Sequence, residues 1–596
     1  MKIKTVFPYL VISICIGSLL IPPSCANTTT PPSGGHKDTL PPVLVRTTPP
    51  YNAVHFSGKQ IELKFNEYVK ISDAANQIYL SPPPAKRLQT VVRGKSVVVT
   101  FAAPLDTNTT YSLYFGKSIA DNNEGNLFGA YTFSFSTGSV IDSLLLSGYV
   151  VDAQTLLPKD NITIMFHTQE GDTVVYKTLP RAIAKTDLWG YFAALNLKGV
   201  PYRVFAVEDL NKNYKYDDNS ETVAFLDSLC VPGTVMVADS FAMKRIDPKD
   251  TLGMLARPME RMLYLFKEHP KRQVLREKVR LQPRHFFLTF SAPDAQINSL
   301  QIAGVDSLSL ICEHSLQKDT LRYWIVGAQV PDTLKGVVNY MKTDSINRLS
   351  PAEEKFTLLP PKADTTRAKA LKIDLSAKPE YVEQTGIIFL FSAYPVELGF
   401  DKMTLTYTTT RNEEAKVPFT FEKDTLNGSK YVLVPQKWTP AVSYTLTIPK
   451  GIFKDLYGLV NDSLSHKIAL PEASKFGSIS VTLKGGQGVY IVELLAKTRD
   501  RVLRSLHVPA GGKGIFPYLS DGNYLIRITE DRNGNGVWDT GSLDQRIQPE
   551  RVRFLSFASG LDLIEIKNKR ELEQIIDIEE LFHHDAYPII PAKTSK

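Results

Sequence analysis

The chain has 596 residues, with 69 Lys and Arg residues against 62 Asp and Glu residues. That length is too great for one hydrophobic core and indicates several domains of about 100–150 residues each. The net charge of +7 is spread along the chain, which excludes the concentrated basic surface of a nucleic-acid-binding protein.

The first 24 residues have the pattern of a signal peptide. A short basic start precedes an apolar run over 6–21, which is too short for a comfortable membrane span. Ser24 then stands directly before Cys25, as in the lipobox of bacterial lipoproteins, although Pro22 replaces the usual leucine. We therefore predict that Cys25 is acylated and anchors the chain to a membrane. The alternative is an ordinary secretory signal, with Cys25 an incidental thiol.

Residues 25–42 are rich in Thr, Pro and Gly and are expected to form a flexible tether. Strand signals dominate beyond them. Segments 61–65 and 131–135 alternate apolar and polar residues, and the β-branched run at 97–101 suits a buried strand. Such runs recur at roughly ten-residue spacing between turn-forming residues, a pattern typical of β-sandwiches. The predicted fold class is all-β, an elongated array of tandem β-sandwich modules.

Breaks in the strand pattern divide the chain into five modules and a C-terminal tail. An early strand of the third module is expected at 263–266. The clearest helical periodicity lies at 570–582, so the tail is expected to contain a short helix. The predicted boundaries are residues 1–24 for the signal peptide, 25–42 for the tether, 43–138, 139–247, 252–359, 371–474 and 476–566 for the modules, and 567–596 for the tail.

Internal repeats support this division. The sequence Tyr-Arg-Val-Phe-Ala-Val-Glu-Asp at 202–209 in the second module is echoed by Tyr-Leu-Ile-Arg-Ile-Thr-Glu-Asp at 524–531 in the fifth. Segment 111–115 of the first module is likewise echoed by 444–448 of the fourth, and each is followed by an Asp and a Gly. We therefore expect two copies of a pair of modules, with one further module between them.

Motifs in the first module resemble the bacterial Ig-like domain of S-layer type. They are Thr48-Pro49-Pro50, Asn66-Glu67 after the 61–65 strand, the segment Leu105 to Tyr111, and the closing Phe133 to Gly138. The second and fifth modules resemble prealbumin-like or carboxypeptidase-regulatory-like sandwiches, with Gly148-Tyr149-Val150 and Gly190-Tyr191-Phe192 as matching segments. The leader, Cys25 with residues 32–42, is similar to that of Ig-like lipoproteins from Bacteroidetes-type bacteria. This resemblance implies an outer-membrane lipoprotein with no established activity.

A duplicated acidic loop is the best candidate for chemistry. Oxygen side chains at alternate positions around a turn suit a hard cation such as calcium. Neither copy has a glutamate at the twelfth loop position, where Ser542 and Ser220 stand, and one copy has Tyr214 in place of the turn glycine. Alternatively, these Asx side chains hydrogen-bond the loop backbone. The candidate calcium ligands are Asp531, Asn533, Asn535 and Asp539 in the fifth module and Asp209, Asn211, Asn213 and Asp217 in the second.

Other reactive groups are interpreted as structural. Cys230 and Cys312 are far apart in the sequence, and we expect two buried, unpaired thiols. Glu67 and Asp121 are interpreted as solvated charges at strand ends and not as a glycosidase pair. The sequence contains no Gly-x-Ser-x-Gly elbow, no Walker-type phosphate loop and no His-Glu-x-x-His motif. No catalytic residue and no cofactor is predicted apart from the calcium sites.

These features predict a non-catalytic envelope lipoprotein that acts as a structural or interaction scaffold, for example as an accessory subunit of an outer-membrane protein or of its assembly or secretion machinery. The predicted partners are the membrane, through the lipid anchor, and other envelope proteins. Neither nucleic acid nor a small-molecule substrate is predicted. Residues 26–30 carry no acidic side chain, which in the similar lipoproteins favours a periplasm-facing position over the cell surface. The alternative is a surface carbohydrate-binding or adhesion lipoprotein.

Overall fold

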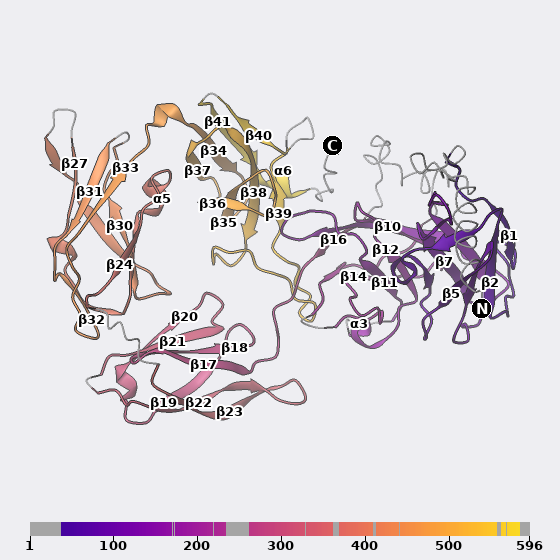
Figure 1. The fold of residues 1–596 in the computed structure, drawn as a ribbon, viewed down its shortest axis with the longest axis horizontal. Helices are drawn as coiled ribbons and strands as arrows, with labels where there is room; N and C mark the ends of the chain where they lie inside the picture. The colour runs from indigo at the N-terminus through magenta and orange to yellow at the C-terminus, as the bar shows by residue number, and fades with distance from the viewer. Residues whose placement is uncertain are drawn as a thin grey trace, which may run out of the picture. The chain divides into compact units, whose positions relative to one another are not determined.

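The computed structural model describes residues 37–583 except 170, 172, 218–219, 234–260, 328, 362–368, 409–412, 440–441, 557–561 and 568. The predictions for the signal peptide, Cys25 and most of the tether therefore lie outside the described residues. Strands far outnumber helices and pair into separate small sheets, which confirms the all-β fold class (Figure 1). The chain divides into two compact units: most residues up to 139 form one, and the remainder, with 80–85 and 110–112, forms the other.

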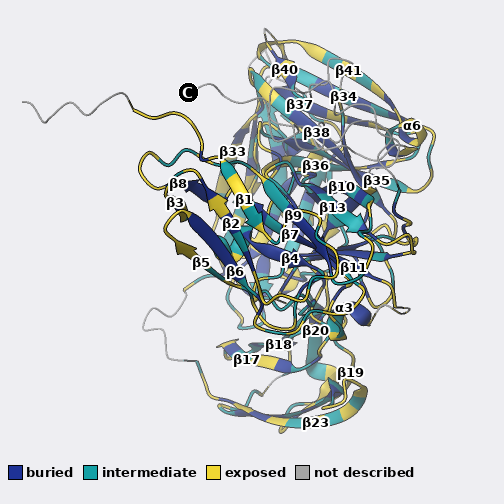
Figure 2. Cartoon of the chain, turned by 90° about the vertical axis from the view of Figure 1, so that its right-hand side faces the viewer, coloured by how far each residue is buried: buried dark blue, intermediate teal, exposed yellow. Residues whose placement is uncertain are grey.

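The first module has the two-layered strand pattern of a sandwich. In its longer sheet, Ile61, Leu63 and Phe65 are buried on one face of β2 because successive side chains of a strand point to opposite faces. Figure 2 shows this burial along the strands. The sheets are β1 (Leu44–Thr48), β2 (Gln60–Phe65), β6 (Ser96–Thr100) and β5 (Gln89–Arg93); β4 (Tyr79–Ser81), β7 (Thr110–Gly116) and β9 (Tyr131–Ser136); and the pair β3 (Val69–Ile71) and β8 (Ile119–Asp121), with helix α2 (Ala74–Gln77).

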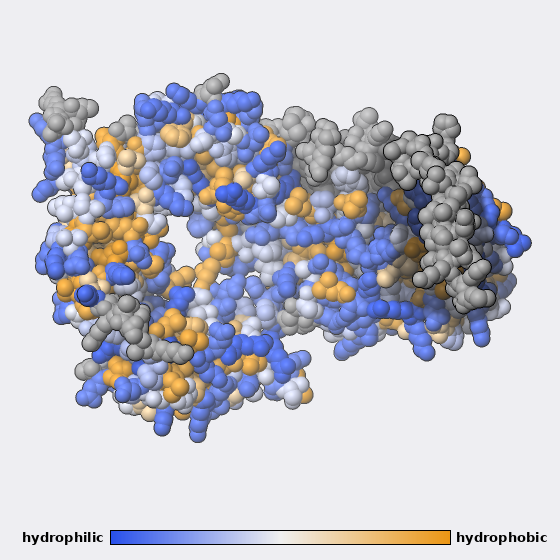
Figure 3. Space-filling view, viewed as in Figure 1, coloured by the Kyte–Doolittle hydropathy of each residue, from blue (hydrophilic) through white to orange (hydrophobic). Residues whose placement is uncertain are grey.

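The fourth module has this topology with one additional strand, β28, which supports the predicted repeat. Its strand β31 corresponds to β7, and these strands contain the echoed segments 444–448 and 111–115. Hydrophobic residues gather on its surface near β30 and β31 (Figure 3). The sheets are β24 (Ile373–Ser376), β25 (Ile387–Phe391), β30 (Lys430–Pro435) and β29 (Phe419–Lys423); β28 (Glu414–Lys416), β27 (Thr404–Thr408), β31 (Ser443–Ile448) and β33 (Leu464–Ala469); and the pair β26 (Pro395–Leu398) and β32 (Phe453–Asp455), with α5 (Val382–Thr385) and the 3-10 turn η3 (Phe400–Lys402).

The second and fifth modules also share one topology. In each, a three-stranded sheet with one parallel pair faces an antiparallel sheet, which has four strands in the second module and five in the fifth. The second module contains β13 (Tyr191–Leu197), β10 (Leu144–Asp152) and β16 (Arg261–Leu265), then β12 (Ala182–Lys185), β11 (Thr163–His167), β14 (Arg203–Val207) and β15 (Val223–Phe225), with α3 (Val174–Lys177). The fifth contains β37 (Lys513–Leu519), β34 (Gly477–Lys484) and β41 (Glu571–Asp577), then β36 (Val502–Pro509), β35 (Val489–Leu495), β38 (Gly522–Asp531) and β39 (Val552–Phe554), with β40 (Ile564–Ile566) on β38 and the turns η4 (Ala473–Lys475) and α6 (Ile578–His583).

The parallel strands correct two sequence-based expectations. Strand β16 was expected to open the third module, but it pairs with β10 and completes a sheet of the second. The expected helix at 570–582 is strand β41 over Glu571–Asp577, and only Ile578–His583 is helical. Within β41 the more buried residues recur with period two and not with the helical period of 3.6. Both strands return to a distant partner, β10 or β34, which a local pattern does not reveal.

The third module lies in the sequence between the first pair of modules, the first and second, and the second pair, the fourth and fifth. Its strand β20 is the edge of a four-stranded sheet, and this explains why Cys312 is exposed there, contrary to expectation. Cys230 is buried as expected, and neither thiol forms a disulfide. The sheets are β17 (Leu275–Gln282), β18 (His285–Phe290), β21 (Thr320–Ile325) and β20 (Leu310–His314), and β19 (Ile297–Ile302), β22 (Leu334–Thr343) and β23 (Leu349–Leu358), with the turn η2 (Ser307–Ser309).

Candidate functional site

The second and fifth modules pack directly against each other. Residues from β10, β16 and the turn after β10 meet residues from β35, β38 and β39 in one apolar cluster, although the two groups are more than 200 residues apart in the sequence. Burying apolar side chains of this size stabilises the pair by about 1.5–3 kcal/mol each as an upper bound. The cluster consists of Tyr149, Val151, Leu156, Met262, Leu495, Leu525, Val552 and Phe554.

Two buried arginines of the fifth module cross this interface. Arg499 donates to the backbone oxygens of Thr155 at 3.2 Å and Leu156 at 3.4 Å, and its guanidinium forms an ion pair with Asp562 at 2.7 Å. Arg527 donates to the backbone oxygen of Gln154 at 3.3 Å. Both side chains thus hold carbonyl groups of the turn after β10, which have no partner within a strand.

A buried glutamate joins the two modules at a second place. Glu268 accepts hydrogen bonds from the Tyr216 hydroxyl at 2.9 Å and from the backbone nitrogen of Leu543 at 2.8 Å. Lys271 bridges Glu268 at 3.0 Å and Asp544 at 2.8 Å. Leu543 itself is fully buried in an apolar cluster of the second module. This contact fixes the loop after the fifth-module acidic turn against the second module.

The acidic loop of the fifth module is closed by its own hydrogen bonds. The Asp531 carboxylate accepts the backbone N–H groups of Asn535 at 3.1 Å and Gly536 at 2.9 Å. The amide nitrogens of Asn533 and Asn535 both donate to Asp539 Oδ2, at 2.5 and 2.9 Å. The Asp and Asn side chains therefore hydrogen-bond the loop itself. This is the alternative to calcium binding that the sequence also allowed.

The loop of the second module has the same contacts. The Asp209 carboxylate accepts the N–H groups of Asn213 at 3.1 Å and Tyr214 at 2.9 Å. Asn211 and Asn213 donate to Asp217 Oδ2 at 2.5 and 2.9 Å. Tyr214 adopts the left-handed conformation, with φ at 57°, where the fifth module has Gly536 at 81°. The structure thus brings all eight predicted residues together in two matching loops.

Each loop is also held by a glutamate that the sequence motif did not reveal. Glu550 accepts the backbone N–H groups of Arg532 at 2.8 Å and Asp539 at 3.0 Å. Glu221 accepts those of Leu210 at 2.9 Å and Asp217 at 3.0 Å. Burial raises the pKa of both carboxyl groups, and the neighbouring aspartates raise it further, while these hydrogen bonds act in the opposite direction.

The orientation of the amide groups bears on the calcium prediction. In both loops two asparagine nitrogens face the final aspartate, and nitrogen of an amide does not bind a hard cation. Calcium binding would therefore require both amides to turn their oxygens inward. In the part of the chain that the structure describes, no group of three or more His, Cys, Asp or Glu residues is arranged to hold a metal. The calcium sites remain a prediction.

A calcium titration of the full chain tests that prediction. If the loops bind calcium, the melting temperature rises at millimolar calcium, because a ligand that binds only the folded state stabilises it. The rise should fall in an Asp531→Asn variant, which keeps the shape of the residue and removes its charge. A melting temperature that is the same with calcium and with chelator contradicts calcium binding and leaves the loops with a purely structural role.

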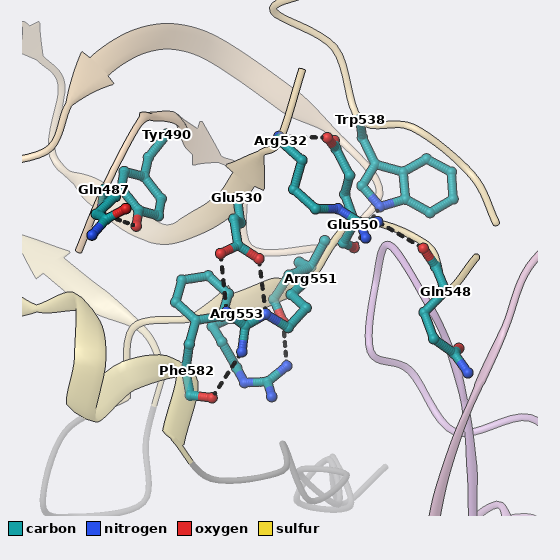
Figure 4. Close-up of polar contacts among 11 residues, drawn as sticks. Gln487, Tyr490, Glu530, Arg532, Trp538, Gln548, Glu550, Arg551, Arg553 and Phe582 are labelled. Carbon is teal, nitrogen blue, oxygen red and sulfur yellow. Dashed lines mark hydrogen bonds and ion pairs between the residues drawn. The ribbon is translucent and has the colours of Figure 1, made fainter. Parts of the chain in front are cut away.

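A cavity of about 440 Å³ lies at the edge of the module interface, lined among others by Phe225 and Tyr264 of the second module and Arg551 of the fifth. Figure 4 shows Arg551 and Arg553 beside the phenyl ring of Phe582. Arg551 forms a two-pronged ion pair with Glu530 at 2.8 and 3.0 Å and donates to the backbone oxygen of Phe582 at 3.3 Å. Arg551 therefore fastens α6 to the fifth module.

Buried carboxylates share one role throughout the described residues. Each of the seven accepts at least one backbone N–H group. Asp121 was expected to be solvated, but it is buried and accepts N–H groups of three residues that follow it; although burial acts to raise its pKa, these bonds lower it. Asp455 of the fourth module accepts the N–H groups of Tyr457 and Leu459 in the turn that follows it. The seven are Asp121, Glu221, Glu268, Glu313, Asp455, Asp531 and Glu550.

The fold and these sites define a chain of tandem β-sandwich modules. Residues 38–137, which span β1 to β9, match the family model of a bacterial Ig-like domain. No curated protein matches the chain. Among the described residues, no helix has the length and apolar character needed to cross a membrane.

Solved structures of bacterial surface proteins are similar to parts of the chain. The N-terminal part of the S-layer protein SbsC is 14% identical, with a TM-score of 0.12, and the match covers 32% of this chain and 41% of that one. A longer SbsC structure is 12% identical, with a TM-score of 0.14, covering 88% and 68%. The major pilin subunit BcpA of Bacillus cereus is 8% identical, with a TM-score of 0.14, covering 73% and 99%. The chain thus spans less than half of the first of these structures.

Proposed function

We propose that this chain is a non-catalytic lipoprotein of the bacterial cell envelope, anchored through Cys25, and that its sandwich modules form a scaffold for other envelope proteins. Its concrete form is an accessory subunit beside an outer-membrane protein or its assembly or secretion machinery. The bacterial Ig-like module at 38–137 supports a location outside the cytoplasm. The signal-like leader and the small residue before Cys25 support the anchor.

The use of the buried carboxylates carries the non-catalytic part of the proposal. A general acid or base must exchange a proton with substrate, but the seven buried carboxylates accept backbone N–H groups of their own chain. The buried Arg499 and Arg527 at the module interface are similarly committed to backbone carbonyls and carboxylates. These groups serve rigidity, which suits a scaffold.

The alternative of carbohydrate binding has weaker support. Sugar-binding surfaces use exposed aromatic platforms, and Trp324 is buried in a stack against His285 with ring centroids 3.9 Å apart. Trp189, Trp438 and Trp538 are half-buried. We therefore favour protein partners over sugars for this chain.

Purification of the tagged full chain in mild detergent tests the scaffold. We expect one or more envelope proteins to remain bound in a constant ratio to the chain through a second, size-based separation. A matched Cys25→Ala variant should lose partners that are reached only at the membrane. Recovery of the chain alone as a monomer would contradict the scaffold function.

Protease treatment of intact cells tests the proposed periplasm-facing position. If the modules face the periplasm, they survive until the outer membrane is broken and are then cleaved. Digestion without lysis would instead place the modules on the cell surface and support the adhesion alternative.

A further inference from the structure

Four segments of the first module meet near Lys37, where the described residues begin. The backbone oxygen of Asp38 accepts a hydrogen bond from the Asn126 side chain at 2.9 Å, and the nitrogen of Val43 donates to Asn66 Oδ1 at 2.7 Å. Lys95 donates to the backbone oxygen of Asn66 at 2.7 Å. The entry segment and the turns after β2, β5 and β8 therefore form one surface, which we call the entry tip.

Large apolar side chains are exposed on every part of the entry tip except the hairpin turn at Lys95. Leu40 is 71% exposed and Val43 58% in the entry segment, Tyr68 is 63% exposed after β2, and Leu127 is 50% exposed after β8. Single exposed apolar residues are ordinary, but four on neighbouring turns form an apolar patch. The four side chains lie in turns and in the segment before β1, outside the strands themselves.

The entry tip also carries basic groups, one of them beside its aromatic ring. The Lys95 ammonium lies 5.7 Å from the centre of the Tyr68 ring, and Lys70 donates to the backbone oxygen of Asn122 at 3.3 Å. Lys37 and Arg93 are also exposed there, against the acidic Asp38, Glu67 and Glu124. A tyrosine beside lysines and aliphatic side chains is the composition that settles at the level of lipid headgroups.

We propose that the entry tip lies on the bilayer that holds the lipid anchor and inserts Leu40, Val43, Tyr68 and Leu127 among the headgroups. Even when fully extended, the twelve residues from Cys25 to Lys37 reach only about 40 Å, so an acylated Cys25 keeps this end of the module close to the membrane. This inference rests on the proposed anchor and deepens it.

Vesicle flotation tests the entry tip without the acyl chain. The test uses the mature chain from residue 25 with Cys25→Ser, all five modules included, and vesicles of phosphatidylethanolamine and phosphatidylglycerol. We expect this chain to float with the vesicles. The double variant Tyr68→Ser, Leu127→Ser should bind about a hundredfold more weakly, because each of the two lost apolar contacts is worth about tenfold. Leu308→Ser, at a 90% exposed leucine of the third module, is the matched control and should bind like the parent chain.

Either of two flotation results would overturn the inference: no flotation of the parent chain, or equal flotation of the double variant. Amide hydrogen exchange on the parent chain gives a second readout that does not depend on the variant's folding. Exchange should slow with vesicles at 38–43, 66–70 and 122–128, and unchanged exchange there would also overturn it. Acylation of Cys25 is measured separately by mass, so the anchor and the tip contact can fail independently.

Discussion

Replacing Arg499 by alanine should destabilise the chain by about 3–5 kcal/mol. Arg499 is only 8% exposed, and it supplies donors to Asp562 and to the carbonyl groups of Thr155 and Leu156. The substitution leaves the Asp562 carboxylate, which is also largely buried, without its ion-pair partner, and removing one partner of a buried pair costs that amount. It also removes the guanidinium that lies 4.2 Å from the centre of the Phe554 ring.

Denaturant unfolding measured separately for the wild type and the variant gives this difference. We expect the second and fifth modules of the variant to separate in a first transition, since the lost contacts join them. Arg501→Ala is the control: Arg501 lies in the same hairpin but is exposed, and its loss should change stability by less than about 0.5 kcal/mol. Equal effects of the two substitutions would show that the interface does not depend on Arg499.

Replacing Glu550 by alanine should open the acidic loop of the fifth module and cost about 3 kcal/mol. The substitution leaves the N–H groups of Arg532 and Asp539 without acceptors, and each such group costs about 1–3 kcal/mol. Trp538, whose indole donates to the Glu550 backbone oxygen, packs in the clusters shared with the second module. The loss should therefore spread from the loop to the module interface.

The comparison with Glu550→Gln separates the hydrogen bonds from the charge. Folding raises the pKa of Glu550, so the folded chain binds this proton more tightly than the unfolded chain. The contribution of the Glu550 carboxyl group to stability is greatest at a pH below its pKa in the unfolded chain. This contribution declines as the pH rises through its pKa in the folded chain. The glutamine variant lacks this pH dependence and keeps one acceptor, so it should lose less than the alanine variant. Glu530→Gln, at a partly exposed ion pair, should cost under about 1 kcal/mol, and a similar cost for all three would contradict the structural role of Glu550.

The strands of single sheets could be predicted from the sequence because their signals are local. Alternation predicted β2 and β9, and β-branched residues predicted β6. Strands β16 and β41 could not be placed, because each joins its sheet through a parallel partner that is distant in the sequence. The repeat between the second and fifth modules does contain this information. When the two modules are aligned, β41 falls where β16 lies, and the alignment predicts a strand in both.

The candidate site was predicted in part for a similar reason. The motif with Asp531, Asn533 and Asn535 has fixed spacing and could be recognised directly. Glu221 and Glu550 were missed because they follow the first aspartate of their loops by 12 and 19 residues, so no fixed spacing marks them. The packing of the second module on the fifth could not be predicted from local sequence. It depends on residues such as Tyr149 and Phe554, which point away from the core of their own module and cannot be told from solvent-exposed strand residues by sequence alone.

These features together describe how the chain would serve as a scaffold. Carboxylates that hold backbone N–H groups stiffen the turns, and buried arginines fasten the fifth module to the second. A rigid pair presents its outer surfaces in a fixed geometry, which reduces the entropy lost when a partner binds. The anchor at Cys25 would confine that surface to the membrane.

Metabolic labelling with a palmitate analogue tests whether Cys25 is acylated and anchors the chain. Cells that express the full chain should yield a labelled, membrane-associated protein whose first residue is Cys25 by mass. The Cys25→Ala variant should remain unlabelled. A mature wild-type chain that carries no label, begins at another residue and is released with the soluble periplasmic or secreted fraction would contradict the account.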